Sequence, residues 1–355
     1  MPSSVSQLKH HKLSNPPLRR LGHQCYCLIA LILLSSSSSP SSSFPSVASA
    51  ANTIKDTPVY GHDDAIFGGI EEQQGDKPFG NVLDAGTGRY SLRWLSTLSL
   101  GSKGMTQLTA ITADDKMLQS ITPLVKKLGI EDITSLVIGN WFGEEEPIPF
   151  ENDQSLLLFD TIIADYLIGA MDGFSPYQQD LIIPKLAKYL KPGGRLYIVG
   201  MEPIPDSSVN KDEDIICQVK RVRDACLLLA GQRPYREYPL EWVTRQVDRT
   251  PGIQLVASNK GTTKITATTT TTTTTTYPIR HSGRFIIRQI NNGRRWLKMI
   301  KPKSLEQEMK NLLDDLENQA LEATKDGKKI ELSFNYVVSA VKLEEVIIDA
   351  AFYSS

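Results

Sequence analysis

Short apolar stretches alternate along most of the chain with segments in which apolar residues recur every three or four positions. The first kind predicts a buried strand and the second an amphipathic helix. From Asn81 to Lys342 this alternation predicts βαβ units around a mostly parallel sheet. The predicted strands are 81–85, 107–112, 135–141, 159–167, 195–201, 253–257 and 331–342. The predicted helices are 116–128, 176–190, 211–230, 240–248 and 305–321, with a bend at Pro184.

The same pattern predicts one α/β domain over residues 81–345, followed by a short tail, 346–355. No repeat and no second hydrophobic core are visible. A Thr-rich stretch, 262–276, is low in complexity and is expected to be an insertion in a loop. The polar segment 51–80, which precedes the first strand, is expected to be either a lid over a ligand or a plain linker.

The first 50 residues have the layout of a targeting segment rather than of a fold. Basic residues precede an apolar run, Cys25 to Leu34, which is too short to span a bilayer. A Ser-rich tract follows, with Ala48-Ser49-Ala50 as a candidate cleavage site, as in a secretory signal peptide. A second candidate cut before Phe44 resembles the presequences of algae with complex plastids. We therefore expect entry into the secretory route, with a disordered Ser-rich tail as the alternative.

Composition narrows the class of protein only in part. Hydrophobic residues make up 40% of the 355 positions and charged residues 22%, which is typical of a globular protein with a sizeable core. A net charge of −1 gives no general attraction to nucleic acid or membrane, so such binding needs a local patch. No cysteine or histidine spacing indicates zinc. Cys217 and Cys226 are expected to lie on opposite sides of one helix, where they do not pair.

The strongest chemical signal is the segment NVLDAGTGRYS at 81–91. It predicts a buried strand that ends at Asp84, a Gly-rich turn through Gly86, Thr87 and Gly88, and then a helix. Glycines suit such a turn because a Cβ would keep a ligand away from the backbone or strain φ, and a helix start favours an anion. Ser91 stands where the dinucleotide fingerprint needs a third glycine, and no P-loop lysine follows. An ordinary strand-to-helix turn remains the alternative.

An acidic residue two places before Gly-x-Gly resembles motif I of the class I S-adenosylmethionine-dependent methyltransferases. A second segment supports the resemblance: YLKPGGRLYIVG at 189–200 is similar to the Pro-Gly-Gly turn that this family places before its fifth strand. The resemblance covers about residues 79–342. It implies a Rossmann-like, seven-stranded sheet with an antiparallel last strand, helices on both faces, and S-adenosyl-L-methionine as the cofactor.

The resemblance also implies roles for individual residues. The loop of Gly86, Thr87 and Gly88 would face the methionine part of the cofactor, and Asp84 would anchor its amino group. After the second strand the family carries an acid that binds the ribose hydroxyls, but here Thr112 stands at that position. We therefore expect Asp114 to bind the ribose, and the alternative is that Asp114 is the N-cap of the next helix.

After the third strand, Asn140 replaces a common acid near the adenine amine and could accept from it, and Trp141 would either stack on the base or belong to the core. After the fourth strand, Asp165 and Tyr166 stand where the family faces the transferred methyl group, and a helix-cap role for Asp165 is the alternative. This pair is not the Asn-Pro-Pro-Tyr of members that methylate amides and amino groups, which disfavours protein glutamine and adenine as acceptors.

Two charged segments remain. The loop with Tyr235, Arg236 and Tyr238 is expected to form an acceptor wall, in which Arg236 suits a carboxylate or phosphate. A salt-bridged helix and loop is the alternative. Residues 280–303 contain Arg and Lys but no acid. They form either an RNA-binding patch or a solvated helix face.

Three functions follow from these observations. We expect methyl transfer to a small-molecule acceptor. An RNA methyltransferase that uses residues 280–303 and a non-catalytic S-adenosylmethionine-binding module remain alternatives. The sequence leaves the oligomeric state open.

Overall fold

The structure is a computed structural model that describes residues 64–100, 103–143, 158–256, 264–267, 270–273 and 275–344. The predicted targeting segment, 1–50, and the tail, 346–355, lie outside the described residues, and so does the start of segment 51–80. The predictions for them stay predictions. Within the described ranges, no helix has the length and apolar character needed to cross a bilayer.

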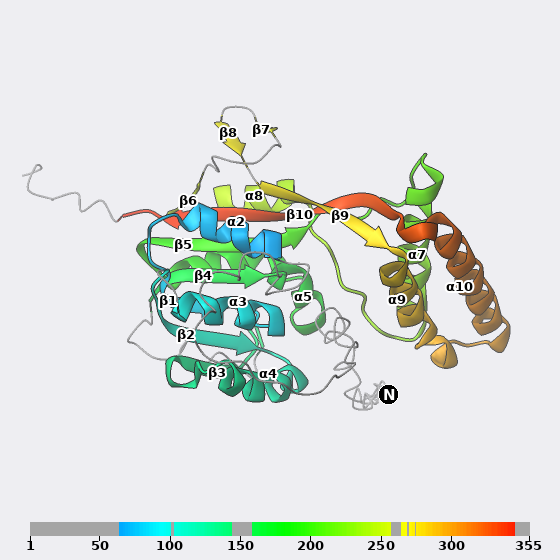
Figure 1. The fold of residues 1–355 in the computed structure, drawn as a ribbon, viewed down its shortest axis with the longest axis horizontal. Coiled ribbons are helices and arrows are strands. Elements are labelled where there is room, and N and C mark those ends of the chain that lie inside the picture. The colour runs from blue at the N-terminus through cyan, green and yellow to red at the C-terminus, as the bar shows by residue number, and fades with distance from the viewer. Residues whose placement is uncertain are drawn as a thin grey trace, which may run out of the picture.

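Seven strands form a continuous sheet, and an eighth pairs beside it (Figure 1). The order across the sheet is β3 (Thr134–Ile138), β2 (Met105–Thr112), β1 (Gly80–Asp84), β4 (Phe159–Asp165), β5 (Leu190–Met201), β10 (Lys329–Lys342) and β6 (Ile253–Leu255). β9 (Thr275–Ser282) also pairs with β10. The first five strands run parallel, and β10 is antiparallel to β5, β6 and β9. The predicted Rossmann-like, mostly parallel sheet with an antiparallel last strand is confirmed, and β9 is an addition.

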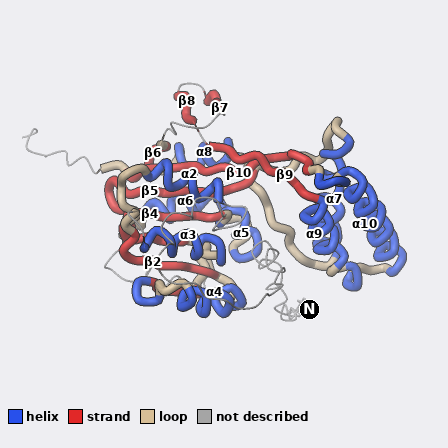
Figure 2. Tube along the Cα trace, in the orientation of Figure 1, coloured by secondary structure: helices blue, strands red, loops and turns tan. Residues whose placement is uncertain are grey.

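Helices cover both faces of this sheet (Figure 2). Successive side chains of a strand point to opposite faces, so Val82 packs in one core and Leu83 in the other. One face carries α2 (Asp64–Gln74), α3 (Arg89–Leu100) and α4 (Asp115–Lys127), and the other carries α5 (Leu167–Phe174), α6 (Ile182–Lys188) and α8 (Leu240–Asp248). The central strands are therefore buried on both sides.

Helix α2 is an integral part of the first core. Phe67 stacks on Trp94 with ring centroids 4.7 Å apart, and the Trp94 indole donates a hydrogen bond of 2.9 Å to Glu71. Ile66 and Ile70 are buried beside them. Residues 64–74 are thus a packed helix and not the linker that was one of the two expectations for this segment.

Three helices form a lobe beyond the end of the sheet, on the right of Figure 1. They are α7 (Lys211–Leu229), α9 (Gly283–Arg294) and α10 (Lys303–Ala323), and they share a hydrophobic cluster of their own. The expectation of no second core is therefore wrong. Ile286 and Ile290 are buried in this cluster, but they lie in the basic segment, whose charge hid the helical pattern. β10 reaches the lobe by pairing with β9 at one end and with β5 at the other.

Several predicted elements differ in extent. The predicted helix 176–190 is a short helix, η4 (Gln179–Leu181), followed by α6, and α5 precedes both. Pro184 is the third residue of α6, where a missing N–H costs little, so no bend is needed. The Thr-rich stretch has structure: β8 (Thr270–Thr273) pairs with β7 (Lys264–Ala267), and Thr275 begins β9. Further single turns are η2 (Glu131–Ile133), η5 (Leu297–Met299) and η6 (Lys325–Gly327).

The predicted Pro-Gly-Gly turn is part of β5, which begins at Leu190, and the register of β5 against β4 shifts there. Gly193 has a φ of +72°, a conformation that glycine adopts without strain. The prediction for the two cysteines is confirmed. Cys217 and Cys226 both lie on α7, are buried, and are not disulfide-bonded.

Candidate functional site

The turn after β1 lies beside the switch point of the sheet, where the strand order reverses. β2 lies on one side of β1 and β4 on the other, and ligands of open α/β sheets bind at the strand ends of such a switch point. Ala85 N–H donates to Ile163 of β4 at 2.9 Å, and Thr87 N–H donates to Ile111 of β2 at 2.8 Å. The turn is therefore tied to both neighbouring strands.

Asp84 is completely buried at the start of this turn. Its Oδ2 accepts a hydrogen bond of 2.7 Å from the Ser91 hydroxyl, which itself accepts from Gly88 N–H at 3.0 Å. The other carboxylate oxygen, Oδ1, and the nearby Thr87 hydroxyl are buried, and neither makes a well-formed hydrogen bond within the described residues. Oδ1 and the Thr87 hydroxyl thus lack a hydrogen bond of normal geometry, although Thr87 and the Gly86 N–H lie near enough to favour the charged carboxylate.

Burial sets the charge state of this carboxyl. Loss of hydration raises the pKa of Asp84 from 3.8 to about 6, although the Ser91 hydroxyl and, less strongly, Thr87 and the Gly86 N–H oppose the shift. Asp84 is consequently ionised at neutral pH, and the burial of its charge destabilises the folded state. A cation placed against Oδ1 would offset that cost.

The two glycines of the turn differ in their surroundings. Neither has a positive φ, so the expectation that strain in φ requires glycine is wrong here. A Cβ at Gly88 would meet no heavy atom within 4 Å, whereas one at Gly86 would lie 3.0 Å from the side chain of Leu167. The open side of the turn is therefore at Gly88, and α5 covers the side at Gly86.

Asp114 is the N-cap of α4. Its Oδ1 accepts from Lys116 N–H at 2.9 Å, and its own N–H donates to the Thr112 hydroxyl at 3.2 Å. The side chain is buried, and it satisfies orphan N–H groups at the helix start. The structure bears out the N-cap alternative, and the ribose-binding role stays a prediction.

Asn140 is held by internal hydrogen bonds. Its amide nitrogen donates to the Phe174 carbonyl at 2.9 Å, and its oxygen accepts from the Ser175 hydroxyl at 2.6 Å. The same oxygen lies 3.3 Å from Phe142 N–H. These bonds fix the chain after β3 to the end of α5, so the oxygen expected to accept from an adenine amine is already engaged.

Trp141 belongs to the core rather than to an open face. It is buried next to Tyr189, and its indole donates a hydrogen bond of 2.7 Å to the Ala85 carbonyl. The core alternative for Trp141 is therefore borne out. The bond gives Trp141 another role, because it supports the turn that follows Asp84.

Asp165 and Tyr166 lie where β4 ends. Tyr166 has a φ of +47° at the start of α5, an uncommon conformation for a bulky residue that occurs often at functional sites. Its hydroxyl donates to Asn335 of β10 at 2.9 Å. Asp165 is half-buried beside it. The structure brings the pair to the same end of the sheet as Asp84.

The predicted acceptor wall lies against α5. A Cβ at Gly169 would be 2.3 Å from the Tyr235 hydroxyl, so the ring rests on the first turns of that helix. Burial, with the negative charges of Glu237 and Asp165 nearby, raises the pKa of Tyr235 well above its usual 10. Tyr235 thus lies near enough to Asp165 to be affected by its charge. The Tyr235 phenol stays protonated.

Ion pairs reduce the charge of the basic segment. Arg280 pairs with Glu331, Arg294 with Asp314 and Glu317, and Lys303 with Glu306. Arg284, Arg288, Arg295, Lys298 and Lys301 have no such partner among the described residues. The cationic surface is smaller than the sequence suggested.

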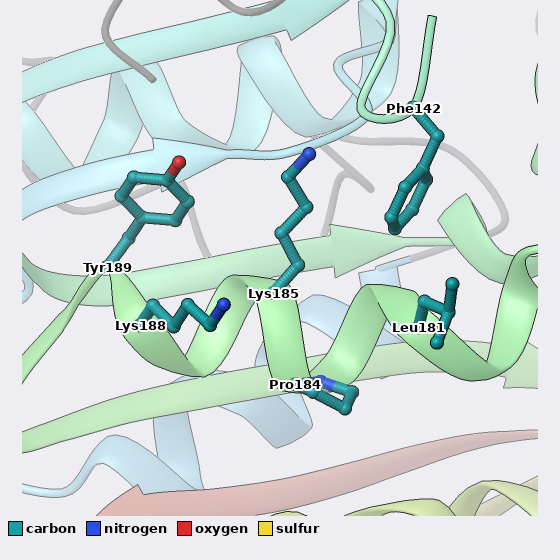
Figure 3. A pocket seen from close by; sticks show the side chains of 6 residues that line it. All are labelled: Phe142, Leu181, Pro184, Lys185, Lys188 and Tyr189. Carbon is teal, nitrogen blue, oxygen red and sulfur yellow. The ribbon is translucent and has the colours of Figure 1, made fainter. Parts of the chain in front are cut away.

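Two surface hollows are present in the described structure, and neither is lined by the turn after β1. One, of about 410 Å³, lies along α6, where Lys185 rises between Tyr189 and Phe142 (Figure 3). Lys185 stands over the Phe142 ring and donates to the Trp141 carbonyl. The other hollow, of about 490 Å³, adjoins the predicted acceptor wall.

Sequence reasoning missed two residues of the turn. Ser91 was seen only as a departure from the dinucleotide fingerprint, yet it holds Asp84. Its position in the first turn of the helix after the loop was the available signal. Leu167 covers Gly86 from α5, a helix that was not predicted, so no sequence signal could have placed it there.

No protein-family model matches this sequence, and no curated protein is significantly similar to it. Solved structures match at low similarity. The [4+2]-cyclase SpnF is 12% identical, with 79% of this chain and 80% of that one covered and a TM-score of 0.42. A putative sarcosine dimethylglycine methyltransferase from Galdieria sulphuraria is 12% identical over 79% and 85%, with a TM-score of 0.39. An S-adenosylmethionine-dependent methyltransferase from Geobacter sulfurreducens, in complex with S-adenosyl-L-homocysteine, is 14% identical over 78% and 90%, with a TM-score of 0.40. Because these similarities are low, the roles of residues below are drawn from this chain alone.

Proposed function

We propose that this protein is an S-adenosylmethionine-dependent methyltransferase that acts on a small-molecule acceptor. The observation that carries the proposal is the buried carboxylate of Asp84, whose Oδ1 lacks a well-formed hydrogen bond at the carboxyl end of the central strand. A buried charge is retained at such a cost where a cation binds it. The amino group of S-adenosylmethionine is a cation of the right kind.

The residues of the turn fit the amino-acid end of this cofactor. Asp84 would accept from the ammonium group, and the Thr87 hydroxyl, which also lacks a well-formed hydrogen bond, lies next to it. The open side of Gly88 lets a ligand approach the backbone. The adenine end finds less support, because the side-chain oxygen of Asn140 is already hydrogen-bonded.

The acceptor would lie between the ends of β4 and β5 and the loop that contains Tyr235. When bound, the cofactor supplies an electrophilic methyl group for in-line displacement by a nucleophile of the acceptor, so the protein contributes mainly orientation and electrostatics. Asp165 is half-buried at the end of β4, and in this proposal it would take a proton from the nucleophile or face positive charge. Tyr235 is held protonated and can donate a hydrogen bond.

A ligand-binding assay on the full chain tests the proposal. Isothermal titration calorimetry with S-adenosylmethionine and S-adenosylhomocysteine should give saturable binding, and ATP and NAD, which share the adenosine group, should bind far more weakly. A ligand at about 100 times its Kd should stabilise the fold by about 2.7 kcal/mol, which a rise in Tm reports. Binding of ATP or NAD as tight as that of S-adenosylhomocysteine would contradict the assignment.

Turnover separates the proposed function from its alternatives. Incubation with an isotopically labelled methyl donor and pools of metabolites should label a small molecule. Binding without any labelling would favour the non-catalytic module. Labelling of RNA, with salt-sensitive retention, would favour the RNA methyltransferase.

A further inference from the structure

The hollow of about 490 Å³ next to the acceptor wall has a size typical of small-molecule sites. Its walls come from α5, from η4, from the loop before α8 and from the first turn of α8. The same loop contains Tyr235, whose electrostatic surroundings include Asp165. The loop that lines the hollow thus also carries a residue of the region where the acceptor is proposed to react.

One side of the hollow offers a hydrogen-bond donor that nothing uses. Gln179 lines it and is 95% buried, with a relative exposure of 5%, and its Nε2 has no hydrogen-bond partner among the described residues. An amide N–H₂ carries two donors and no accepting capacity. A buried donor without a partner needs an explanation, and a ligand with acceptor oxygens bound beside it would supply one.

Among the four charged side chains that line the hollow, Arg236 is the one without an ion-pair partner within the described residues. Arg233 pairs with the buried Asp172 at 3.3 Å, and Glu237 pairs with Lys220 at 3.7 Å. Arg236 itself is exposed. A guanidinium group binds carboxylates and phosphates in a two-pronged geometry. The free charge and the free amide donor both favour an anion with oxygen atoms.

Another part of the lining is aromatic. Tyr238 and Trp242 lie with ring centroids 4.7 Å apart and an interplanar angle of 47°. Both are partly buried and pack on the core beneath. The Tyr238 hydroxyl group is also uncharged at neutral pH, because burial raises its pKa above the usual 10. This wall can cover a flat apolar group.

We propose that this hollow binds the oxyanionic end of a small-molecule acceptor, a carboxylate or a phosphate monoester attached to a flat apolar group. Arg236 and Gln179 donate hydrogen bonds to the oxygen atoms, and Tyr238 and Trp242 cover the apolar part. The proposal rests on the proposed methyl transfer for the identity of the ligand as acceptor. The hollow itself can be tested without the cofactor.

The test is a ligand-observed NMR titration of the full chain with benzoate, phenyl phosphate and the neutral benzamide, at about 0.15 M salt so that exposed charges are screened. For probes of this size we expect a Kd on the order of 1 mM. At least one of the two anions should bind, and benzamide should bind at least about tenfold more weakly, because it lacks the charge that Arg236 recognises. The preferred anion distinguishes a carboxylate acceptor from a phosphate.

Two variants and a matched control locate the binding. Arg236→Gln should weaken anion binding by about tenfold or more, the loss expected for a charge-assisted hydrogen bond. Gln179→Leu should weaken it as well. Arg245→Gln should leave it unchanged, because Arg245 is an exposed arginine of α8 that pairs with Glu241 and does not line the hollow.

No binding of either anion to the wild-type protein, equal binding of benzamide, or an unchanged Kd in Arg236→Gln would each overturn the proposal. The titration with S-adenosylhomocysteine tests methyl transfer independently of the anion titration. Anion binding without S-adenosylhomocysteine binding keeps the oxyanion site and removes methyl transfer. The reverse result removes only the oxyanion site.

Discussion

Replacing Asp84 by asparagine removes a buried negative charge and leaves the shape of the side chain almost unchanged. The asparagine oxygen can still accept the hydrogen bond that Ser91 now donates. The substitution therefore tests whether the carboxylate at the end of β1 stabilises the native state or destabilises it and is kept for binding a ligand.

The magnitude follows from the pKa of this carboxyl. A rise from 3.8 to about 6 corresponds to roughly 3 kcal/mol, at about 1.4 kcal/mol for each pKa unit. Between these two pH values the folded protein holds a proton that the unfolded chain has released. The free energy of unfolding therefore decreases as the pH rises from about 4 to about 6, and it stays lower above that range.

Asparagine carries no charge, so the free energy of unfolding of the variant does not decrease in this way between about pH 4 and about pH 6. Urea denaturation should show Asp84→Asn to be more stable than the wild type by about 1–3 kcal/mol near pH 8, and nearly equal to it near pH 4. Its affinity for S-adenosylhomocysteine should fall at least tenfold, the loss expected when a charged hydrogen bond is removed. A variant that is less stable than the wild type by more than about 1 kcal/mol near pH 8 would refute the reasoning.

Three further predictions concern other parts of the fold. His281 is buried with one ring nitrogen unpartnered, and burial lowers its pKa, so the free energy of unfolding should fall as the pH drops below about 6.5. In urea denaturation at about pH 5 and about pH 7, His281→Gln should reduce that loss of stability. An equal loss in the variant would show that His281 is not its cause. Trp141→Phe leaves the Ala85 carbonyl without its indole partner and should lower the free energy of unfolding by about 1–3 kcal/mol, whereas an unchanged urea midpoint would show that the bond does not matter. Arg294→Met removes two ion pairs within the helical lobe and should speed hydrogen exchange in α9 and α10 but not in α6; equal acceleration in α6 would show that the lobe does not open separately.

The periodicity of the sequence predicted the sheet well because its strands have apolar residues on both faces and polar turns between them. β1, β2, β4 and β10 lie where the pattern places them. Two helices of the lobe, α7 and α10, were predicted, but α9 and the separate core were missed for a physical reason. α9 buries only Ile286, Ile290 and Gly293 among basic residues, and three buried positions in a helix of twelve give too weak an apolar signal.

The parts of the site formed by residues that are close in the sequence were predictable, whereas the parts that depend on packing between distant segments were not. The strand, turn and helix around Asp84 follow one another in sequence, so their geometry could be anticipated. The hydrogen-bond partners of Asn140 and Trp141 could not, because those partners, Phe174 and Ala85, are distant in the sequence. Gln179 gave no signal in the sequence, since only tertiary packing buries it without a partner.

The central claim is that the open side of the turn at Gly88 faces a bound S-adenosyl nucleoside. Gly88→Val tests it, because a Cβ there meets no atom of the protein within 4 Å. Gly68→Val is the matched control, since Gly68, on α2, is equally open and also has no positive φ. Titration of S-adenosylhomocysteine by calorimetry should give a Kd at least about tenfold weaker for Gly88→Val, a difference of about 1.4 kcal/mol, and an unchanged Kd for Gly68→Val. An unchanged Kd in a folded Gly88→Val protein would contradict the account.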